Sequence, residues 1–122
     1  MKRLIVMVAV ALSLAAAAQC ADINGRWARG DGSARVKIGP CGEDICAVNT
    51  WIKPGTPKEK EGDKLVMSIK PDGKGAYSGT AFDPQRDMSY RLTVTVSGDT
   101  MTTKGCVMAG LLCKAMDWTR IN

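Results

Sequence analysis

Apolar and polar residues alternate over several short stretches of this chain. In residues 88–96, Met88, Tyr90, Leu92, Val94 and Val96 fall on one face of an extended backbone, and the residues between them are polar or charged. This period of two is typical of a strand with one buried face. Residues 34–38 alternate in the same way. We predict further strands at residues 23–29, 45–52, 64–70, 76–83, 100–107 and 115–121.

Turn-forming residues separate these stretches, and no segment has the period of a long helix. The turn segments are Gly30-Asp31-Gly32, Pro71-Asp72-Gly73, Asp83-Pro84 and Ser97-Gly98-Asp99. Short connections between consecutive strands indicate an antiparallel sandwich or barrel. Closing a meander pairs its first strand with its last and removes both exposed edges. We therefore expect an all-β fold, a small closed antiparallel up-and-down barrel of about eight strands.

The size of the barrel limits what its interior can hold. An eight-stranded barrel is just wide enough to be filled by side chains or to hold one small ligand. The part expected to fold, residues 22–122, is one short barrel domain. We therefore expect no large cavity.

Residues 53–63 interrupt the strand pattern with two prolines, two glycines and six charged residues. Such a segment has little apolar surface to bury, so we predict a mobile, solvated connection. A lid over a binding site is the alternative interpretation.

The first 21 residues have the features of a cleavable secretion signal. Lys2 and Arg3 precede an apolar run, and small residues follow it before Asp22. The run is short for a bilayer span and no second apolar run follows, so we expect no transmembrane span. The protein is predicted to be periplasmic or secreted by a bacterium.

The chain has five cysteines, of which Cys20 lies at the expected cleavage region. Cys20 is either removed, lipidated or left as a free thiol. The other four form two pairs that are close in sequence, and each pair has turn-forming residues between its cysteines. We therefore predict the disulfides Cys41–Cys46 and Cys106–Cys113. A zinc site made by these four cysteines is the rival interpretation, although neither spacing is that of a usual zinc knuckle.

Charge and composition exclude several classes of function. The chain contains no histidine, which removes catalysis by a Ser-His-Asp or Cys-His arrangement and histidine-ligated metal. Catalysis by a carboxylate pair remains as a third possibility, but the acidic residues lie mostly in turns and no motif fixes a pair. The formal charge of +5 falls to +3 without Lys2 and Arg3, and no basic stripe is interleaved with aromatic residues. We expect no enzyme, no cofactor, no metal and no nucleic-acid partner.

Four residues on the predicted strands are candidates for contact with a ligand: Trp51, Tyr77, Tyr90 and Met88. Each offers a large apolar surface, and the tyrosines and tryptophan add a polar group. Filling the core is the alternative role for all four. The segment between Cys106 and Cys113 is unusually apolar, and it is either an exposed contact surface or a plug over the barrel mouth.

A set of short motifs spans almost all of the predicted domain. The motifs are Gly25-Arg26-Trp27, Pro40-Cys41-Gly42, Cys46-Ala47, Lys70-Pro71-Asp72-Gly73, Phe82-Asp83-Pro84, Lys104-Gly105-Cys106 and Trp118-Thr119-Arg120. In this order and spacing they resemble the bacterial family known as domain of unknown function 2147. The resemblance implies a small exported lipocalin-like barrel without an established biochemical activity. Family members often carry a longer insertion where this chain has residues 53–63.

A Gly-x-Trp on the first strand with an arginine on the last is also similar to the device that closes one end of lipocalin barrels. The resemblance implies that Gly25, Trp27, Trp118 and Arg120 close this barrel, with the arginine lying over a tryptophan ring.

The sequence therefore leads to an exported, non-enzymatic binding module for a small apolar or amphipathic ligand. The alternative is an envelope module that interacts with another protein, or has a structural role, and holds no small molecule.

Overall fold

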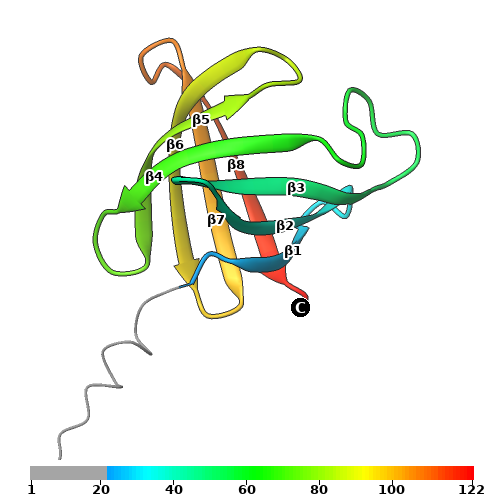
Figure 1. Ribbon diagram of the computed structural model, residues 1–122, viewed down its shortest axis with the longest axis horizontal. Coiled ribbons are helices and arrows are strands. Elements are labelled where there is room, and N and C mark those ends of the chain that lie inside the picture. The colour runs from blue at the N-terminus through cyan, green and yellow to red at the C-terminus, as the bar shows by residue number, and fades with distance from the viewer. Residues whose placement is uncertain (1–21) are drawn as a thin grey trace, which may run out of the picture.

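A computed structural model describes residues 22–122, which form one barrel (Figure 1). The signal sequence predicted at residues 1–21 lies outside the described residues. The eight strands are β1 (Gly25–Arg29), β2 (Ala34–Cys41), β3 (Asp44–Ile52), β4 (Lys64–Pro71), β5 (Ala76–Asp83), β6 (Met88–Ser97), β7 (Thr100–Val107) and β8 (Leu112–Arg120). Among these residues there is no helix of the length and hydropathy needed to cross a membrane.

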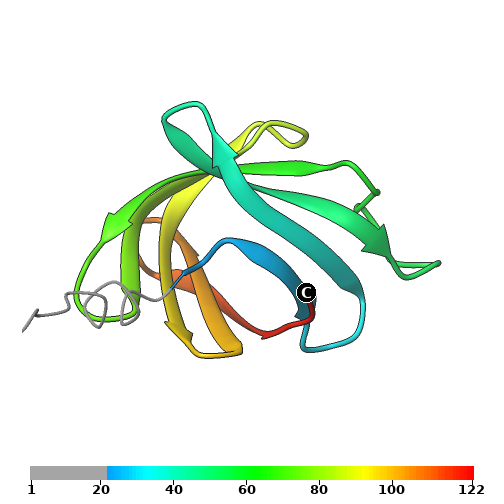
Figure 2. The ribbon, with the colours of Figure 1, turned by 60° about the horizontal axis from the view of Figure 1, so that its bottom comes forward.

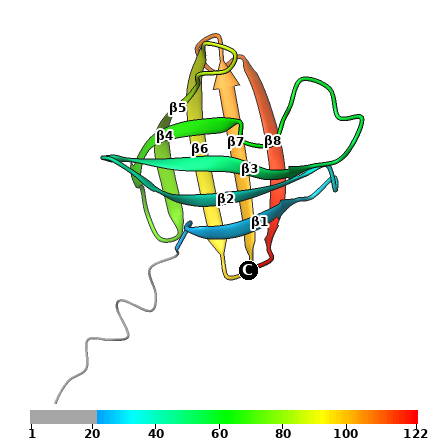
Figure 3. The same cartoon turned by 45° about the vertical axis from the view of Figure 1, so that its right-hand side comes forward.

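Each strand pairs antiparallel with the next, and β1 pairs with β8 to close the barrel. The prediction of a closed up-and-down barrel is thereby confirmed. In Figure 3, β1 to β4 cross in front of the other strands, and β1 lies beside the end of β8. Figure 2 shows the strands wrapping around a common interior. The seam between β1 and β8 is short, with three register pairs from Trp27–Arg120 to Arg29–Trp118.

The alternation seen in the sequence builds the core. Leu92, Val94 and Val96 of β6 are buried, and the residues between them are exposed. Buried residues of other strands join them in one cluster: Ile23, Trp27, Val36, Ile38, Met67, Ala81 and Met101. Burying one such aliphatic side chain contributes about 1.5–3 kcal/mol to folding.

One end of the barrel is closed around Trp27, which is completely buried. Its indole nitrogen donates a hydrogen bond to the carbonyl oxygen of Ile23 at 3.0 Å. The guanidinium of Arg120 lies 4.3 Å from the centroid of the Trp27 ring. Gly25 makes this approach possible, because a Cβ there would lie 2.8 Å from an Arg120 nitrogen. The hydrogen bonds of Arg120 to the carbonyl oxygens of Asp22 and Asn24 tie the chain across this end.

Both disulfides have the local pairing that the spacing predicted. Cys41 bonds Cys46 across the connection of β2 to β3, and Cys106 bonds Cys113 across the hairpin of β7 and β8. The second pair is also a directly opposed register pair. β8 therefore begins at Leu112, three residues before the predicted strand, because the bonded cysteines extend the ladder toward the turn.

The segment 53–63 is better anchored than its composition suggested. The backbone nitrogen of Lys53 donates to the carbonyl oxygen of Ser33, and the backbone of Asn49 is hydrogen bonded to Gly62 and Asp63. A loop held by such contacts is not the freely mobile connection that we predicted.

Candidate functional site

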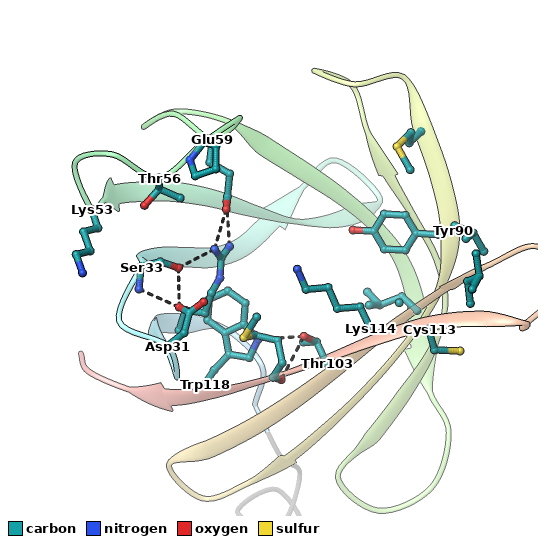
Figure 4. A pocket seen from close by; sticks show the side chains of 18 of the residues that line it. Asp31, Ser33, Lys53, Thr56, Glu59, Tyr90, Thr103, Cys113, Lys114 and Trp118 are labelled. Carbon is teal, nitrogen blue, oxygen red and sulfur yellow. Dashed lines mark hydrogen bonds and ion pairs between the residues drawn. The ribbon is translucent and has the colours of Figure 1, made fainter.

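The end of the barrel opposite Trp27 opens into a cavity of about 1040 Å³ (Figure 4). Strands β6, β7 and β8 supply one wall, and the β1–β2 turn with residues 53–59 supplies the other. The expectation of no large cavity was wrong. It rested on the shortness of the strands, whereas residues 53–57 and Glu59, although mostly exposed, add to the wall beyond the strands.

The wall made by β6, β7 and β8 is mainly apolar because the inward positions of these strands carry large side chains. Met88, Tyr90 and Leu92 come from β6, and Met116 and Trp118 come from β8. A wall of this composition suits an apolar or amphipathic molecule.

Gly105 lets an aromatic ring lie flat against this wall. A Cβ at Gly105 would come within 2.8 Å of the Tyr90 ring, so only glycine leaves the ring its position. The Tyr90 hydroxyl points into the cavity in Figure 4. Burial raises the pKa of the Tyr90 phenol, and the negative charge of Asp83 adds to this effect. Tyr90 is therefore a neutral hydrogen-bond donor at physiological pH.

Arg29 dominates the opposite side of the cavity. Its guanidinium binds both carboxylate oxygens of Glu59, at 2.8 and 3.0 Å, and donates to the Ser33 hydroxyl at 3.1 Å. It also lies 5.2 Å from the centroid of the Trp118 ring. Hydrogen bonding to Arg29 lowers the pKa of Glu59 and, reciprocally, raises that of Arg29. This group of contacts fastens residues 53–63 to the first strand.

The remaining acidic group of the cavity is also engaged. Asp31 accepts hydrogen bonds from the hydroxyl and the backbone nitrogen of Ser33, and these bonds lower the pKa of the Asp31 carboxyl. Both cavity carboxylates are therefore ionised at neutral pH. Within residues 22–122, no three His, Cys, Asp or Glu side chains gather in a way that could hold a metal ion.

The four sequence candidates for ligand contact lie in different places. Tyr90 and Met88 line the cavity. Tyr77 packs against the buried core and is not among the cavity residues. Trp51 is also outside the lining and lies opposite the exposed Arg35, whose guanidinium is 4.9 Å from the centroid of its ring.

A β-bulge explains the position of Trp51. The register of β2 and β3 shifts between Arg35 and Val36, so that Arg35 pairs with Trp51 while Val36 pairs with Asn49. The extra residue on β3 reverses which face the following side chain occupies. The alternation of apolar residues along β3 alone does not reveal this reversal.

We expected Trp118 to lie with Trp27 at the closed end of the barrel, but it lines the cavity instead. Its indole nitrogen donates a hydrogen bond to the hydroxyl of Thr103 at 3.0 Å. The residues of the site that we did not identify from the sequence include Arg29, Glu59, Leu92, Gly105 and Lys114. Lys114, Met116 and Trp118 occupy alternate positions of β8 and therefore share its inward face. The sequence could have placed Lys114 on this face only if the predicted strand had begun at Leu112 rather than at residue 115.

The rim beside β7 and β8 carries exposed apolar side chains. Met108 and Leu111, at the tip of the disulfide-bonded hairpin, are 64% and 80% exposed. Leu112 is 58% exposed and lies at the cavity edge. Of the two interpretations of this loop, the structure shows the exposed surface rather than a plug.

Comparison with known families gives one match. A profile of the family described as uncharacterized protein conserved in bacteria (DUF2147) matches residues 25–120. Because the match spans most of the chain, the chain belongs to this family, and the resemblance found in the sequence motifs is confirmed. No curated protein and no solved structure matches the chain.

Proposed function

We propose that the protein is an exported, non-enzymatic binding module whose cavity takes a small apolar or amphipathic ligand. The cavity of about 1040 Å³ carries this proposal. Ligand sites are typically clefts of roughly 300–1,000 Å³ with a mainly apolar lining and a few polar groups. The wall formed by β6, β7 and β8 has that composition, and the Arg29–Glu59 pair adds fixed polar groups opposite it.

Export is part of the proposal. Residues 1–21 have the composition of a secretion signal, and two short disulfides are typical of proteins that fold in an oxidising compartment. These observations support a periplasmic or secreted location.

The state of the cavity carboxylates supports binding rather than catalysis. Asp31 and Glu59 are each held ionised by hydrogen bonds, so neither is suited to give up a proton as a general acid at neutral pH. The chain also has no histidine to act in its place.

Native mass spectrometry of the protein purified from its own host, together with titration by an apolar fluorescent dye, tests this proposal. We expect a co-purifying small molecule or, after its removal, saturable dye binding. Met116→Trp should crowd the apolar wall of the cavity and weaken dye binding at least about tenfold. Ala115→Trp adds a similar side chain to the exposed outer face of the same strand and should leave binding unchanged. Equal dye binding by both variants would contradict a ligand site inside the barrel.

A protein-interaction module is the second candidate, favoured by the exposed apolar tip at Met108 and Leu111. Exposed apolar side chains of this size mark contact surfaces when they cluster. If a protein partner co-purifies with the natural chain but not with the Met108→Ser, Leu111→Ser double variant, and the cavity binds nothing, this candidate replaces the first.

A further inference from the structure

An ammonium group without a partner lies at the apolar wall of the cavity. Lys114 lies on the same face of β8 as Met116 and Trp118, because the three residues occupy alternate positions. Figure 4 shows the Lys114 side chain extending into the cavity. Within residues 22–122, no carboxylate forms an ion pair with it and no hydrogen bond is made by its ammonium.

A second unpaired donor approaches the same space. Lys114 is the register partner of Gly105, and the Tyr90 ring covers Gly105 from the neighbouring strand. The hydroxyl of Tyr90 and the ammonium of Lys114 therefore reach into the cavity from adjoining positions (Figure 4). No hydrogen bond from the Tyr90 hydroxyl is found among the described residues.

The charges on the other side of the cavity do not neutralise this ammonium. Glu59 is bound by both nitrogens of Arg29, and Asp31 is bound by Ser33. The positive charge of Lys114 is thus left for a molecule that enters the cavity. An anion accepts hydrogen bonds from an ammonium and a phenol, and such charge-assisted bonds are about twice as strong as neutral ones.

The position of the two donors also orients a ligand. Lys114 lies toward the open end, and Trp118 lies four residues deeper on the same strand, a distance of about 13 Å. Met116 lies on the apolar wall between these levels, and Leu92 lies at the register level of Lys114, two strands away. An alkyl chain can lie along this wall while its headgroup stays at the level of Lys114.

We infer that the ligand is an amphiphile with one anionic headgroup, which Lys114 and Tyr90 bind at the cavity mouth while the apolar chain lies against Leu92 and Met116. This inference rests on the proposed binding function and adds the charge of the ligand. A carboxylate, as in a fatty acid, and a phosphate, as in a lipid headgroup, share the required chemistry.

Four probes with the same twelve-carbon chain separate charge from apolar contact. They are dodecanoate, dodecyl phosphate, dodecanol and dodecyltrimethylammonium, each titrated by calorimetry below its micelle-forming concentration. We expect both anions to bind at least about tenfold more tightly than dodecanol, and the cation to bind most weakly. The tighter of the two anions identifies whether a carboxylate or a phosphate is the better fit.

Lys114→Met keeps the length of the side chain and removes its charge. This variant should lower the affinity for dodecanoate at least about tenfold and change the affinity for dodecanol by a much smaller factor. Tyr90→Phe should weaken anion binding by a smaller factor. Lys104→Met removes an exposed lysine from the outer face of β7, and it is the matched control with no expected effect.

The outcomes distinguish the inference of an anionic headgroup from the proposed binding of an apolar ligand in the cavity. If dodecanol and dodecanoate bind equally well and Lys114→Met changes neither, the inference is overturned and the apolar container remains. If none of the four probes binds, the container proposal itself fails.

Discussion

Two tryptophan–arginine pairs interlock across the seam of the barrel. Trp27 of β1 lies opposite Arg120 of β8, and Arg29 of β1 lies opposite Trp118 of β8. Each arginine lies against the ring of its partner, at 4.3 and 5.2 Å from the respective centroids. The first pair closes the barrel end and the second lines the cavity. The same two residue types therefore close the barrel at one level and line the cavity wall at the next.

Arg120 is expected to stabilise the fold through its shape as well as its charge. Arg120→Lys loses the flat contact with Trp27 and cannot keep the hydrogen bonds to Asp22 and Asn24 in the same geometry. We expect a loss of about 2 kcal/mol in the free energy of unfolding, measured by urea denaturation. Arg91→Lys, at an exposed position of β6, should change it by less than about 0.5 kcal/mol. Equal effects of the two substitutions would contradict this role.

At the scale of strands, the sequence predicted the fold well because the information is local. Alternation and turn residues located every strand, and the cysteine spacing located both disulfides. The cavity depends on information that is not local. The bulge that turns Trp51 outward and the ion pair that holds Glu59 at the wall arise only when separate segments meet. The need for glycine at position 105 becomes evident only in the folded protein, where the Tyr90 ring packs against it.

The loop 53–63 should lose its anchor in acid. Arg29 lowers the pKa of Glu59, so the stabilisation from this pair is complete above the ordinary carboxyl pKa and is lost as the pH falls through the lowered value in the folded protein. At about pH 7, Glu59→Gln should therefore reduce the free energy of unfolding by about 1 kcal/mol. The difference between variant and natural protein should shrink as the pH falls below the ordinary carboxyl pKa, and it should vanish once the pH is below the lowered pKa of Glu59 in the folded protein.

Denaturant unfolding across this pH range measures the effect. Glu61→Gln, two residues along the same loop, is the matched control because no ion pair of Glu61 is found within residues 22–122. A Glu59→Gln deficit that stays constant down to about pH 3 would show that packing, rather than charge, anchors the loop.

At the scale of the whole molecule, the cavity and the closure of the barrel share a structural element. The seam has three register pairs, whereas β6 with β7 has seven and β7 with β8 has eight. The pair Arg29–Trp118 belongs both to the seam and to the cavity wall. A ligand that packs against this wall also restrains the strand that closes the barrel, so binding and closure should be coupled.

Hydrogen exchange followed by mass spectrometry tests this coupling. Without ligand, we expect the amides of β1 to exchange faster than those of β6 and β7, because local opening begins where fewest pairs hold a strand. Saturation with dodecanoate should slow exchange in β1 more than in the β2–β3 hairpin, which does not line the cavity between Ala34 and Trp51. With Met116→Trp, which crowds the apolar wall and weakens binding, the same concentration of dodecanoate should slow exchange in β1 by a smaller factor. If β1 is already as protected as β6, or if dodecanoate slows exchange equally in every strand, the seam is not where the barrel opens, and the link between the site and closure fails.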